Sequence, residues 1–219
     1  MIVAAASAPQ QQTAQRPAAI LAPGRRFYDP ANAVWVVKVY PGDSQTTSRA
    51  DEVLVTVLGS CVAACIRDPA TGIGGMNHFM LPEDDSGQWG ADLMSTRYGN
   101  HAMEKLINEL IKRGCPRERL EVKVFGGANV IDSRQAIGSK NAAFVLRYLA
   151  DEGLRCVAQD LGGDFPRRIQ YSPVTGRVAR RMLGRTDVEP IVSEEKAYAV
   201  TLRAPQQADG KIELFGDFR

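Results

Sequence analysis

Thiol and imidazole groups are scarce in this chain, and their positions narrow the chemistry that it could perform. Four cysteines and two histidines occur in 219 residues. Cys61 directly follows a Gly59-Ser60 turn between two apolar runs, and such a turn can expose the sulfur. His78 lies one turn and about one strand further along. A cysteine attacks carbonyl carbon as a thiolate, and an adjacent imidazole can accept its proton. The spacing therefore predicts a Cys61–His78 pair, with a core histidine beside a buried cysteine as the alternative.

The remaining thiols and the second histidine fit structural roles better than chemical ones. Cys65 lies within an apolar run, where a free cysteine commonly behaves as a small buried hydrophobe. Packing or surface positions are also expected for Cys115, Cys156 and His101. A metal site built from Cys61, Cys65, Cys115 and His78 is disfavoured, because the C-x-x-x-C spacing is unusual for zinc and no second pair completes it. We therefore expect no metal.

A catalytic imidazole also needs a group that orients it and donors that stabilise an oxyanion. Thr56, on the apolar run that enters the turn, could orient His78 through its hydroxyl. The backbone N–H groups at and after Ser60 are candidate oxyanion donors, and Gly59 belongs to the same turn. Asn77 is a further candidate for positioning substrate, although a neighbour in a strand points to the opposite face from His78. Threonine is common in strands and serine in turns, so each of these residues also has a structural interpretation.

The segments that must position these groups follow from hydrophobic periodicity. Residues 53–82 are typical of successive buried strands, because β-branched apolar runs alternate with Gly, Asp and Pro. An amphipathic helix is predicted from a cap at Ser95 or Thr96 to Gly114, and a second from Gly138 to Glu152. Further strands are predicted within residues 34–40, 120–125, 154–160, 167–171, 177–182 and 192–204, with 167–171 and 177–182 forming a hairpin.

Strands and helices alternate only in part along the chain. This order predicts an α/β or α+β fold, in which mixed β-sheets and two main helices pack as a layered sandwich, rather than a doubly wound sheet. Neither a G-x-G-x-x-G fingerprint nor a P-loop occurs, so nucleotide binding has no support. The content of 44% hydrophobic and 24% charged residues is ordinary for a globular protein.

Charge and composition also bear on partners and location. The net charge of +2 is too small to suggest a nucleic-acid partner. No apolar run approaches the ~20 residues that span a bilayer, and the N-terminal segment lacks the basic start of a signal peptide. The four cysteines include no C-x-x-C pair, which fits reduced thiols. These observations predict a cytoplasmic protein without membrane insertion.

The chain divides into one folded domain and two extensions. Residues 1–33 form a predicted arm that is rich in Ala, Pro and Gln and is expected to be disordered, with order beginning near Arg25. Residues 34–204 form the domain, and residues 205–219 form a polar tail.

Several collinear blocks resemble the CheD chemoreceptor glutamine deamidases. They are LGSCVAAC (58–65), RDP (67–69), GGMNHFMLP (74–82), KVFGGAN (123–129), IGSKN (137–141), DLGG (160–163), PRR (166–168) and TGRV (175–178). The resemblance covers roughly residues 34 to 185. It implies a Cys-His-Thr hydrolase, with a fold similar to that of toxin-type cysteine deamidases. Cys61 corresponds to the nucleophile, His78 to the base and Thr56 to the threonine. Thr56 lies one residue closer to Cys61 than the family pattern has it, and one residue reverses the facing side of a strand.

The resemblance also implies an activity and partners. The expected reaction converts glutamine side chains on the cytoplasmic helices of chemoreceptors to glutamate through a thioester, without metal or organic cofactor. A CheC-type phosphatase is an expected partner in some organisms. Two alternatives remain, namely an adaptor that binds receptor or chemotaxis proteins without catalysis, and a thiol hydrolase that acts on receptor methyl esters.

Overall fold

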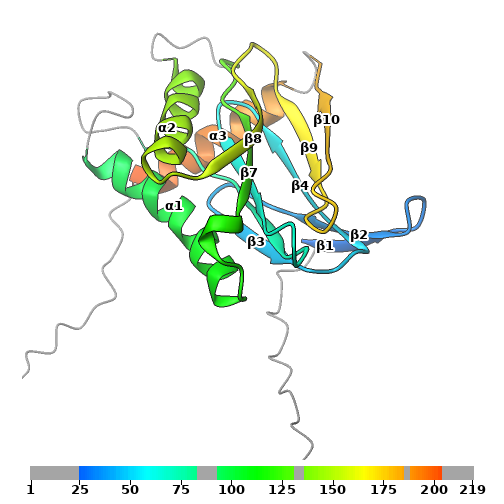
Figure 1. Cartoon of the computed structure of the whole chain (residues 1–219). Helices are drawn as coiled ribbons and strands as arrows, with labels where there is room; N and C mark the ends of the chain where they lie inside the picture. The colour runs from blue at the N-terminus through cyan, green and yellow to red at the C-terminus, as the bar shows by residue number, and fades with distance from the viewer. Residues whose placement is uncertain (1–24, 83–92, 131–135, 185–187, 204–219) are drawn as a thin grey trace, which may run out of the picture.

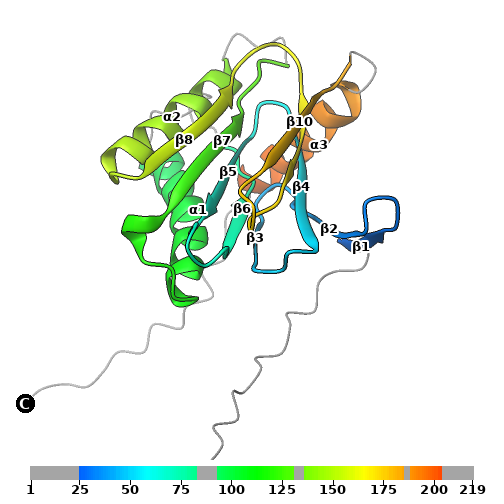
Figure 2. The ribbon, with the colours of Figure 1, turned by 45° about the vertical axis from the view of Figure 1, so that its right-hand side comes forward.

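Two five-stranded β-sheets face each other, and two helices cover the outer side of one of them, while a third packs against the core between the sheets (Figures 1 and 2). The computed structural model describes residues 25–82, 93–130, 136–184 and 188–203. Its helices are α1 (Leu93–Lys112), α2 (Ile137–Asp151) and α3 (Val188–Arg203), with a short 3-10 helix at Arg117–Arg119. The layered arrangement of two sheets and helices confirms the predicted fold class.

Each sheet combines parallel and antiparallel pairs. The first sheet has the order β1 (Arg26–Asp29), β2 (Val34–Lys38), β4 (Glu52–Leu58), β9 (Arg167–Tyr171) and β10 (Val178–Met182). The second has the order β3 (Ser44–Thr47), β6 (Gly74–Asn77), β5 (Val62–Arg67), β7 (Glu121–Gly126) and β8 (Arg155–Leu161). Strands β2 and β4 run parallel, as do β7 and β8, while the other pairs are antiparallel. The predicted hairpin of β9 and β10 is confirmed.

Strand β5 is buried on both faces, which explains its unbroken apolar sequence. Val62, Ala64 and Ile66 face the core under α1 and α2. Ala63 and Cys65 face the core between the two sheets. Strand β5 thus divides the hydrophobic interior into two layers, and its alternation decides which layer each neighbouring side chain enters.

The two predicted helices begin and end close to their expected limits. Helix α1 begins at Leu93, so that Thr96 lies inside its first turn rather than at the expected N-cap. Apolar side chains of both helices join the core on the outer face of the second sheet, among them Leu106, Leu110 and Val145. Periodic apolar stripes of this kind are what the sequence predicted.

The last segment of the domain corrects the prediction of a strand within residues 192–204, because it forms helix α3. The β-branched residues of this segment favoured a strand. The partly or fully buried residues of α3 whose side chains are described instead follow helical spacing, and they are Val188, Ile191, Val192, Glu195, Tyr198, Ala199 and Leu202. A glutamate interrupts this stripe at its centre and hides the helical period from a hydrophobicity count.

The folded domain begins earlier than residue 34. Strand β1 pairs with β2 from Arg26↔Val37 to Asp29↔Val34, so part of the predicted arm belongs to the first sheet. Residues 1–24 of the arm and the tail 205–219 lie outside the described residues.

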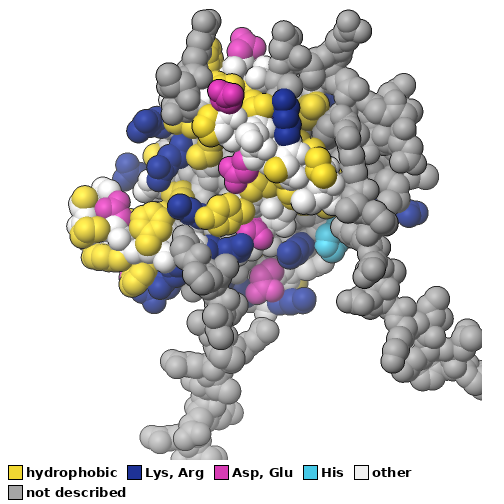
Figure 3. Space-filling view, turned by 180° about the vertical axis from the view of Figure 1, so that it is seen from behind, with side chains coloured by type: hydrophobic (Ala, Val, Ile, Leu, Met, Phe, Trp, Pro, Cys, Tyr) yellow, Lys and Arg dark blue, Asp and Glu magenta, His cyan; other side chains and the backbone are white. Residues whose placement is uncertain are grey.

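The outer surface is chemically mixed. Figure 3 shows acidic, basic and apolar side chains interspersed on the face opposite to that of Figure 1. Among the residues that the structure describes, no helix is both long enough and apolar enough to cross a membrane.

Candidate active site

The turn Gly59–Cys61 carries the chain from β4 in the first sheet to β5 in the second. Its carbonyl groups are all held from one side. The N–H of Gly127 donates to the Cys61 carbonyl at 2.8 Å, and that of Ala128 donates to the Gly59 carbonyl at 2.8 Å. The Asn141 side-chain amide donates to the Ser60 carbonyl at 2.9 Å. Because the carbonyls are fixed by the segment that follows β7 and by α2, the N–H groups of the turn are free to point elsewhere.

Gly126 makes this clamp possible. Its φ is +110°, and a Cβ built on it would lie 2.1 Å from the Cys61 carbonyl oxygen. Only glycine permits so close an approach in this conformation. The KVFGGAN block and the IGSKN block, which supplies Asn141, therefore support the turn that carries Cys61.

The three N–H groups of the turn converge on the carboxylate of Glu195 from α3. Oε1 accepts hydrogen bonds from the N–H groups of Gly59 and Cys61, both at 3.0 Å. Oε2 accepts from the Ser60 N–H at 2.9 Å and from the Ser60 hydroxyl at 2.6 Å. Successive N–H groups that point to one centre form an anion-binding nest. The N–H donors that the sequence predicted at this turn thus point to one place, and the Glu195 carboxylate occupies that place.

Cys61 and His78 enter the space between the sheets from the same face. Val62 pairs with Phe79 through two hydrogen bonds of 2.9 Å. Continuing this register pairs Cys61 with Met80 and Ala63 with His78, so the thiol and the imidazole are diagonal neighbours on one face. Their side chains therefore point into the same inter-sheet space.

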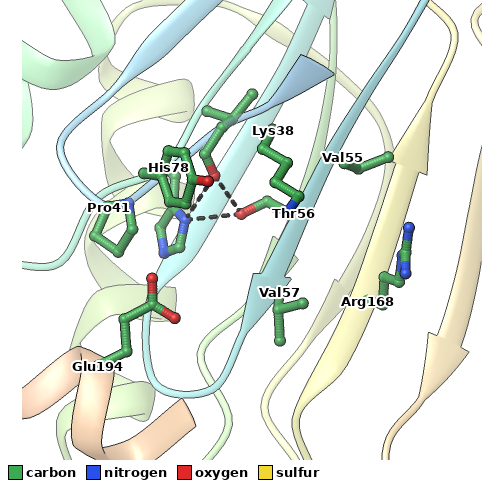
Figure 4. Close-up of a pocket in the computed structure, with 10 residues that line it drawn as sticks. Lys38, Pro41, Val55, Thr56, Val57, His78, Arg168 and Glu194 are labelled. Atoms are coloured by element: carbon green, nitrogen blue, oxygen red, sulfur yellow. Dashed lines mark hydrogen bonds between the residues drawn. The ribbon is translucent and has the colours of Figure 1, made fainter. Parts of the chain in front are cut away.

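Thr56 contacts His78, although the family pattern left its register open. Along β4, Leu54, Thr56 and Leu58 alternate toward the inter-sheet core. The Thr56 hydroxyl donates to the Val39 carbonyl at 2.8 Å and lies 2.8 Å from His78 Nδ1 (Figure 4). Nδ1 also lies 3.4 Å from the Val39 carbonyl.

These contacts select one tautomer of His78. The threonine proton is used by the Val39 carbonyl, so the hydroxyl oxygen can only accept from Nδ1–H. A bare Nδ1 would instead face the carbonyl lone pairs. With the proton on Nδ1, Nε2 carries the free lone pair, and within the described structure this buried atom has no hydrogen-bond partner. The imidazole thus presents an unprotonated ring nitrogen, which a general base would need.

Burial sets the protonation state of both groups. It lowers the pKa of His78 from 6.5 to about 4, against an opposing effect of the Glu195 charge. Burial also raises the pKa of the Cys61 thiol well above its usual range, and the Glu195 carboxylate adds to this through its charge and a hydrogen bond. With α3 in place, the pair is therefore a neutral imidazole and a protonated thiol.

The expected exposure of Cys61 is wrong for this conformation, because its exposed fraction is 0%. Cys61 is part of the inter-sheet core, against which Tyr198, Ala199 and Leu202 of α3 also pack, and Glu195 of α3 accepts the Cys61 N–H. Beside His78 a pocket of about 300 Å³ remains open, lined by Thr56, Pro41, Arg168 and Glu194 among others. Figure 4 shows Glu194 reaching from α3 toward the imidazole. Access to the histidine is thus partial, and access to the thiol is closed.

The other candidates lie apart from this centre. Asn77 faces α1, where its oxygen accepts from the Ala64 N–H at 2.8 Å and its nitrogen donates to the Ala102 carbonyl at 3.0 Å. Asn77 therefore joins β5 to α1 and does not reach the turn. Cys65 and Cys115 are buried, while Cys156 and His101 are exposed. Among the described residues, no group of three or more His, Cys, Asp or Glu side chains could hold a metal ion.

Sequence reasoning missed Glu195. The signal was available only as a glutamate in the middle of an otherwise apolar helical stripe, and the strand prediction for this segment concealed it. Buried carboxylates are rare unless they are paired or hydrogen-bonded, so this position marks a site once the helix is recognised.

Comparison with known proteins gives one consistent family relation. A family model described as CheD chemotactic sensory transduction matches residues 80–182. A Rhodopseudomonas palustris protein is 52% identical over 191 residues, which cover 87% of this chain and 89% of the relative. A Methylobacillus flagellatus protein is 48% identical over 86% of this chain and 94% of its own length. A Halorhodospira halophila protein is 44% identical over 87% of this chain and 89% of its own. All three bear the name "Probable chemoreceptor glutamine deamidase CheD".

Proposed function

The chain belongs to the CheD family, and on this premise we propose that it is a protein-glutamine glutaminase that deamidates chemoreceptor glutamines, with Cys61 as nucleophile and His78 as base. The observation that carries the proposal is that three N–H donors of the Cys61 turn meet at one acceptor, while Thr56 holds His78 on the same face of the sheet as Cys61. Acyl transfer from an amide needs these three components, and it needs no metal or organic cofactor.

The first half of the reaction forms a thioester. His78 Nε2 takes the Cys61 proton as the sulfur attacks the carboxamide carbon of the substrate glutamine. The carbonyl oxygen becomes an oxyanion, and the Gly59 and Cys61 N–H groups are placed to receive it. Collapse of this intermediate breaks the carbon–nitrogen bond, and the imidazolium gives its proton to the departing nitrogen. The products are ammonia and a glutamyl thioester.

The second half restores the enzyme. His78 Nε2, again neutral, takes a proton from water as the water oxygen attacks the thioester carbon. The same N–H groups receive the second oxyanion, and the carbon–sulfur bond then breaks. Cys61 regains a proton, and the substrate side chain leaves as glutamate. Thr56 acts as a positioning residue in both halves, because it holds the Nδ1–H and thereby keeps Nε2 directed at the reaction.

The location and partners of the protein form part of the proposal. We place the enzyme in the cytoplasm, where the helical part of a chemoreceptor would meet it, with residues 34–204 together with β1 as the catalytic domain. A CheC-type phosphatase is the proposed regulator. The ground for both is the family relation, and co-purification with such a phosphatase tests the second.

Receptor fragments incubated with purified enzyme test the proposed chemistry. We expect ammonia release and the mass gain of amide-to-acid exchange with the wild type, and neither with Cys61→Ala. Cys65→Ala is the matched control, since this second buried cysteine lies in the same core outside the turn, and it should retain activity. Full activity in Cys61→Ala would show that the nucleophile is assigned wrongly.

A further inference from the structure

Helix α3 buries a charge at its centre. Glu195 has an exposed fraction of 3%, whereas the apolar residues on the same side of the helix, Tyr198, Ala199 and Leu202, are only partly buried. Burying a carboxylate is unfavourable unless hydrogen bonds replace its hydration. A helix that only covered a core would carry an apolar residue here. The carboxylate must therefore form hydrogen bonds with specific groups on the surface that α3 covers.

Those groups form the N–H nest of the catalytic turn. Within the described structure, the N–H groups of Gly59, Ser60 and Cys61 and the Ser60 hydroxyl donate hydrogen bonds to the carboxylate. Gly59 leaves room for it, because a Cβ at this position would lie 2.9 Å from Glu195 Oε2. None of the ion pairs among the described residues includes Glu195. The charge is thus held by the same groups that would hold an oxyanion.

A glutamate side chain bound at this place has the chemical form of the reaction product. Deamidation leaves a carboxylate next to the thiol, with one oxygen at the oxyanion donors. Glu195 matches this description, with Oε1 on the N–H groups of Gly59 and Cys61.

We propose that α3 is a built-in product mimic, which fills the groove for a helical substrate segment and keeps the enzyme closed until α3 leaves. The inference rests on the proposed function and adds how the substrate binds and what controls access to the thiol. The carboxylate of Glu195 occupies the position of the reacting glutamine side chain. The Glu195 charge adds to burial in holding the Cys61 thiol protonated, so closure acts on the protonation of the thiol as well as on access to it.

The contacts of α3 describe the partner that this groove accepts. Tyr198, Ala199 and Leu202 pack against the inter-sheet core one and two helical turns after Glu195. The Tyr198 hydroxyl also hydrogen-bonds to the Tyr98 hydroxyl of α1. A substrate segment in the same groove would be an α-helix with apolar residues one and two turns after its glutamine. In helix-in-groove binding of this kind, side chains at helical spacing anchor the helix in the groove.

Selective alkylation of cysteines in the full chain tests the closure without any receptor. Iodoacetamide reacts with accessible thiolates, and peptide mapping reports each cysteine separately. We expect Glu195→Ala to raise the alkylation rate of Cys61 at least tenfold, while Glu189→Ala, an exposed glutamate of the same helix, leaves it unchanged. Cys65 reports unfolding because it is buried in the same core, and exposed Cys156 serves as the reference. An unchanged Cys61 rate in Glu195→Ala, with Cys65 still protected, would overturn the proposal.

A peptide of residues 188–203 tests the groove itself. Added to the Glu195→Ala protein, the peptide should protect Cys61 again, and the same peptide carrying Glu195→Ala should not. Failure of the wild-type peptide to protect would show that α3 does not bind through this carboxylate. Receptor deamidation is measured in parallel. A Cys61 that opens and closes as expected in a protein that never deamidates receptor would refute the proposed function and leave the closure standing.

Discussion

Substitution of Glu195 by glutamine converts the product mimic into a potential substrate. The new amide would enter the nest beside Cys61 with its carbonyl oxygen on the Gly59 and Cys61 N–H groups. If the carboxylate marks the position of the reacting side chain, the enzyme should deamidate its own helix. We therefore predict that the Glu195→Gln protein regenerates glutamate at position 195 and that this needs the Cys61 thiol.

The geometry gives the size of the first effect. The amide nitrogen replaces Oε2, which accepts from the Ser60 N–H at 2.9 Å and the Ser60 hydroxyl at 2.6 Å. The hydroxyl can rotate and accept, but the N–H then faces another donor. A hydrogen bond to a charged group contributes about 1.5–3 kcal/mol, so docking of α3 weakens by about 2 kcal/mol. This corresponds to a roughly thirtyfold smaller ratio of docked to undocked α3.

Mass spectrometry of the proteolytic peptide that contains position 195 follows the conversion. We expect the amide to be lost with time in Glu195→Gln and to persist in the Cys61→Ala/Glu195→Gln double variant. Alkylation of Cys61 provides a second readout. It should start high in Glu195→Gln, because α3 is weakly docked, and decline as the carboxylate reappears.

Persistence of the amide in Glu195→Gln would refute this reasoning, provided that the same preparation deamidates a receptor fragment. The thiol would then be active and the helix docked in a position that does not place residue 195 for attack. Loss of the amide in the double variant would also contradict it, since spontaneous hydrolysis would then explain the change. Cys65→Ala/Glu195→Gln controls for loss of a neighbouring thiol and should convert like the single variant.

Three further predictions concern the residues that surround the thiol. Thr56→Val should lower receptor deamidation about tenfold or more, because the imidazole loses its acceptor and shifts from its productive geometry, while Thr56→Ser, which keeps the hydroxyl, should stay near wild type in the same assay. The pKa of His78 is lowered from 6.5 to about 4 in the folded protein, so the unfolded chain binds a proton at higher pH than the folded one. The free energy of unfolding should therefore fall by about 3 kcal/mol as pH drops from 6.5 to 4. Denaturant unfolding across this range should show that slope, and His78→Gln should flatten it. Gly59→Ala should place a Cβ 2.9 Å from the Glu195 carboxylate, and this Cβ should exclude both α3 and substrate from the nest. Cys61 alkylation should then rise while receptor deamidation is lost. A variant with a protected Cys61 and full activity would show that the nest has room for a Cβ.

Much of the site follows from local periodicity. The order of strand, turn and strand around Cys61 was readable from apolar runs and a Gly-Ser pair, and alternation within strands decides which side chains share a face. His78 and Thr56 meet because each alternates toward the same inter-sheet space. The sequence also indicated correctly that Asn77 would face away from its neighbour. These predictions depend on the alternation of successive side chains between the two faces of a strand, and short strands preserve this alternation.

The closure of the site could not be predicted in the same way. It depends on contact between the turn after β4 and a helix near the end of the domain, and no local pattern specifies a contact over such a distance in sequence. The strand prediction for residues 192–204 failed because Glu195 interrupts the apolar stripe of α3 at its centre. A hydrophobicity count treats this residue as a break, whereas it is the most buried of residues 188–202. The residue that we propose controls access to the site is thus the same residue that hides the helical period of α3 from sequence analysis.

The turn that we propose to be catalytic and its proposed closure have one physical origin. Stabilising an oxyanion requires N–H donors that are fixed before the reaction and not used by the fold. The clamp on the carbonyls of Gly59, Ser60 and Cys61 meets this requirement, because it holds the turn from the side opposite to its N–H groups. Donors left unpaired in a buried space would be unfavourable in the resting enzyme. A carboxylate supplied by the chain itself satisfies them and raises the pKa of the adjacent thiol at the same time. In the proposed mechanism, the geometry that favours the reaction thus makes a single glutamate on a helix sufficient to prevent it, and a substrate helix must first replace that carboxylate.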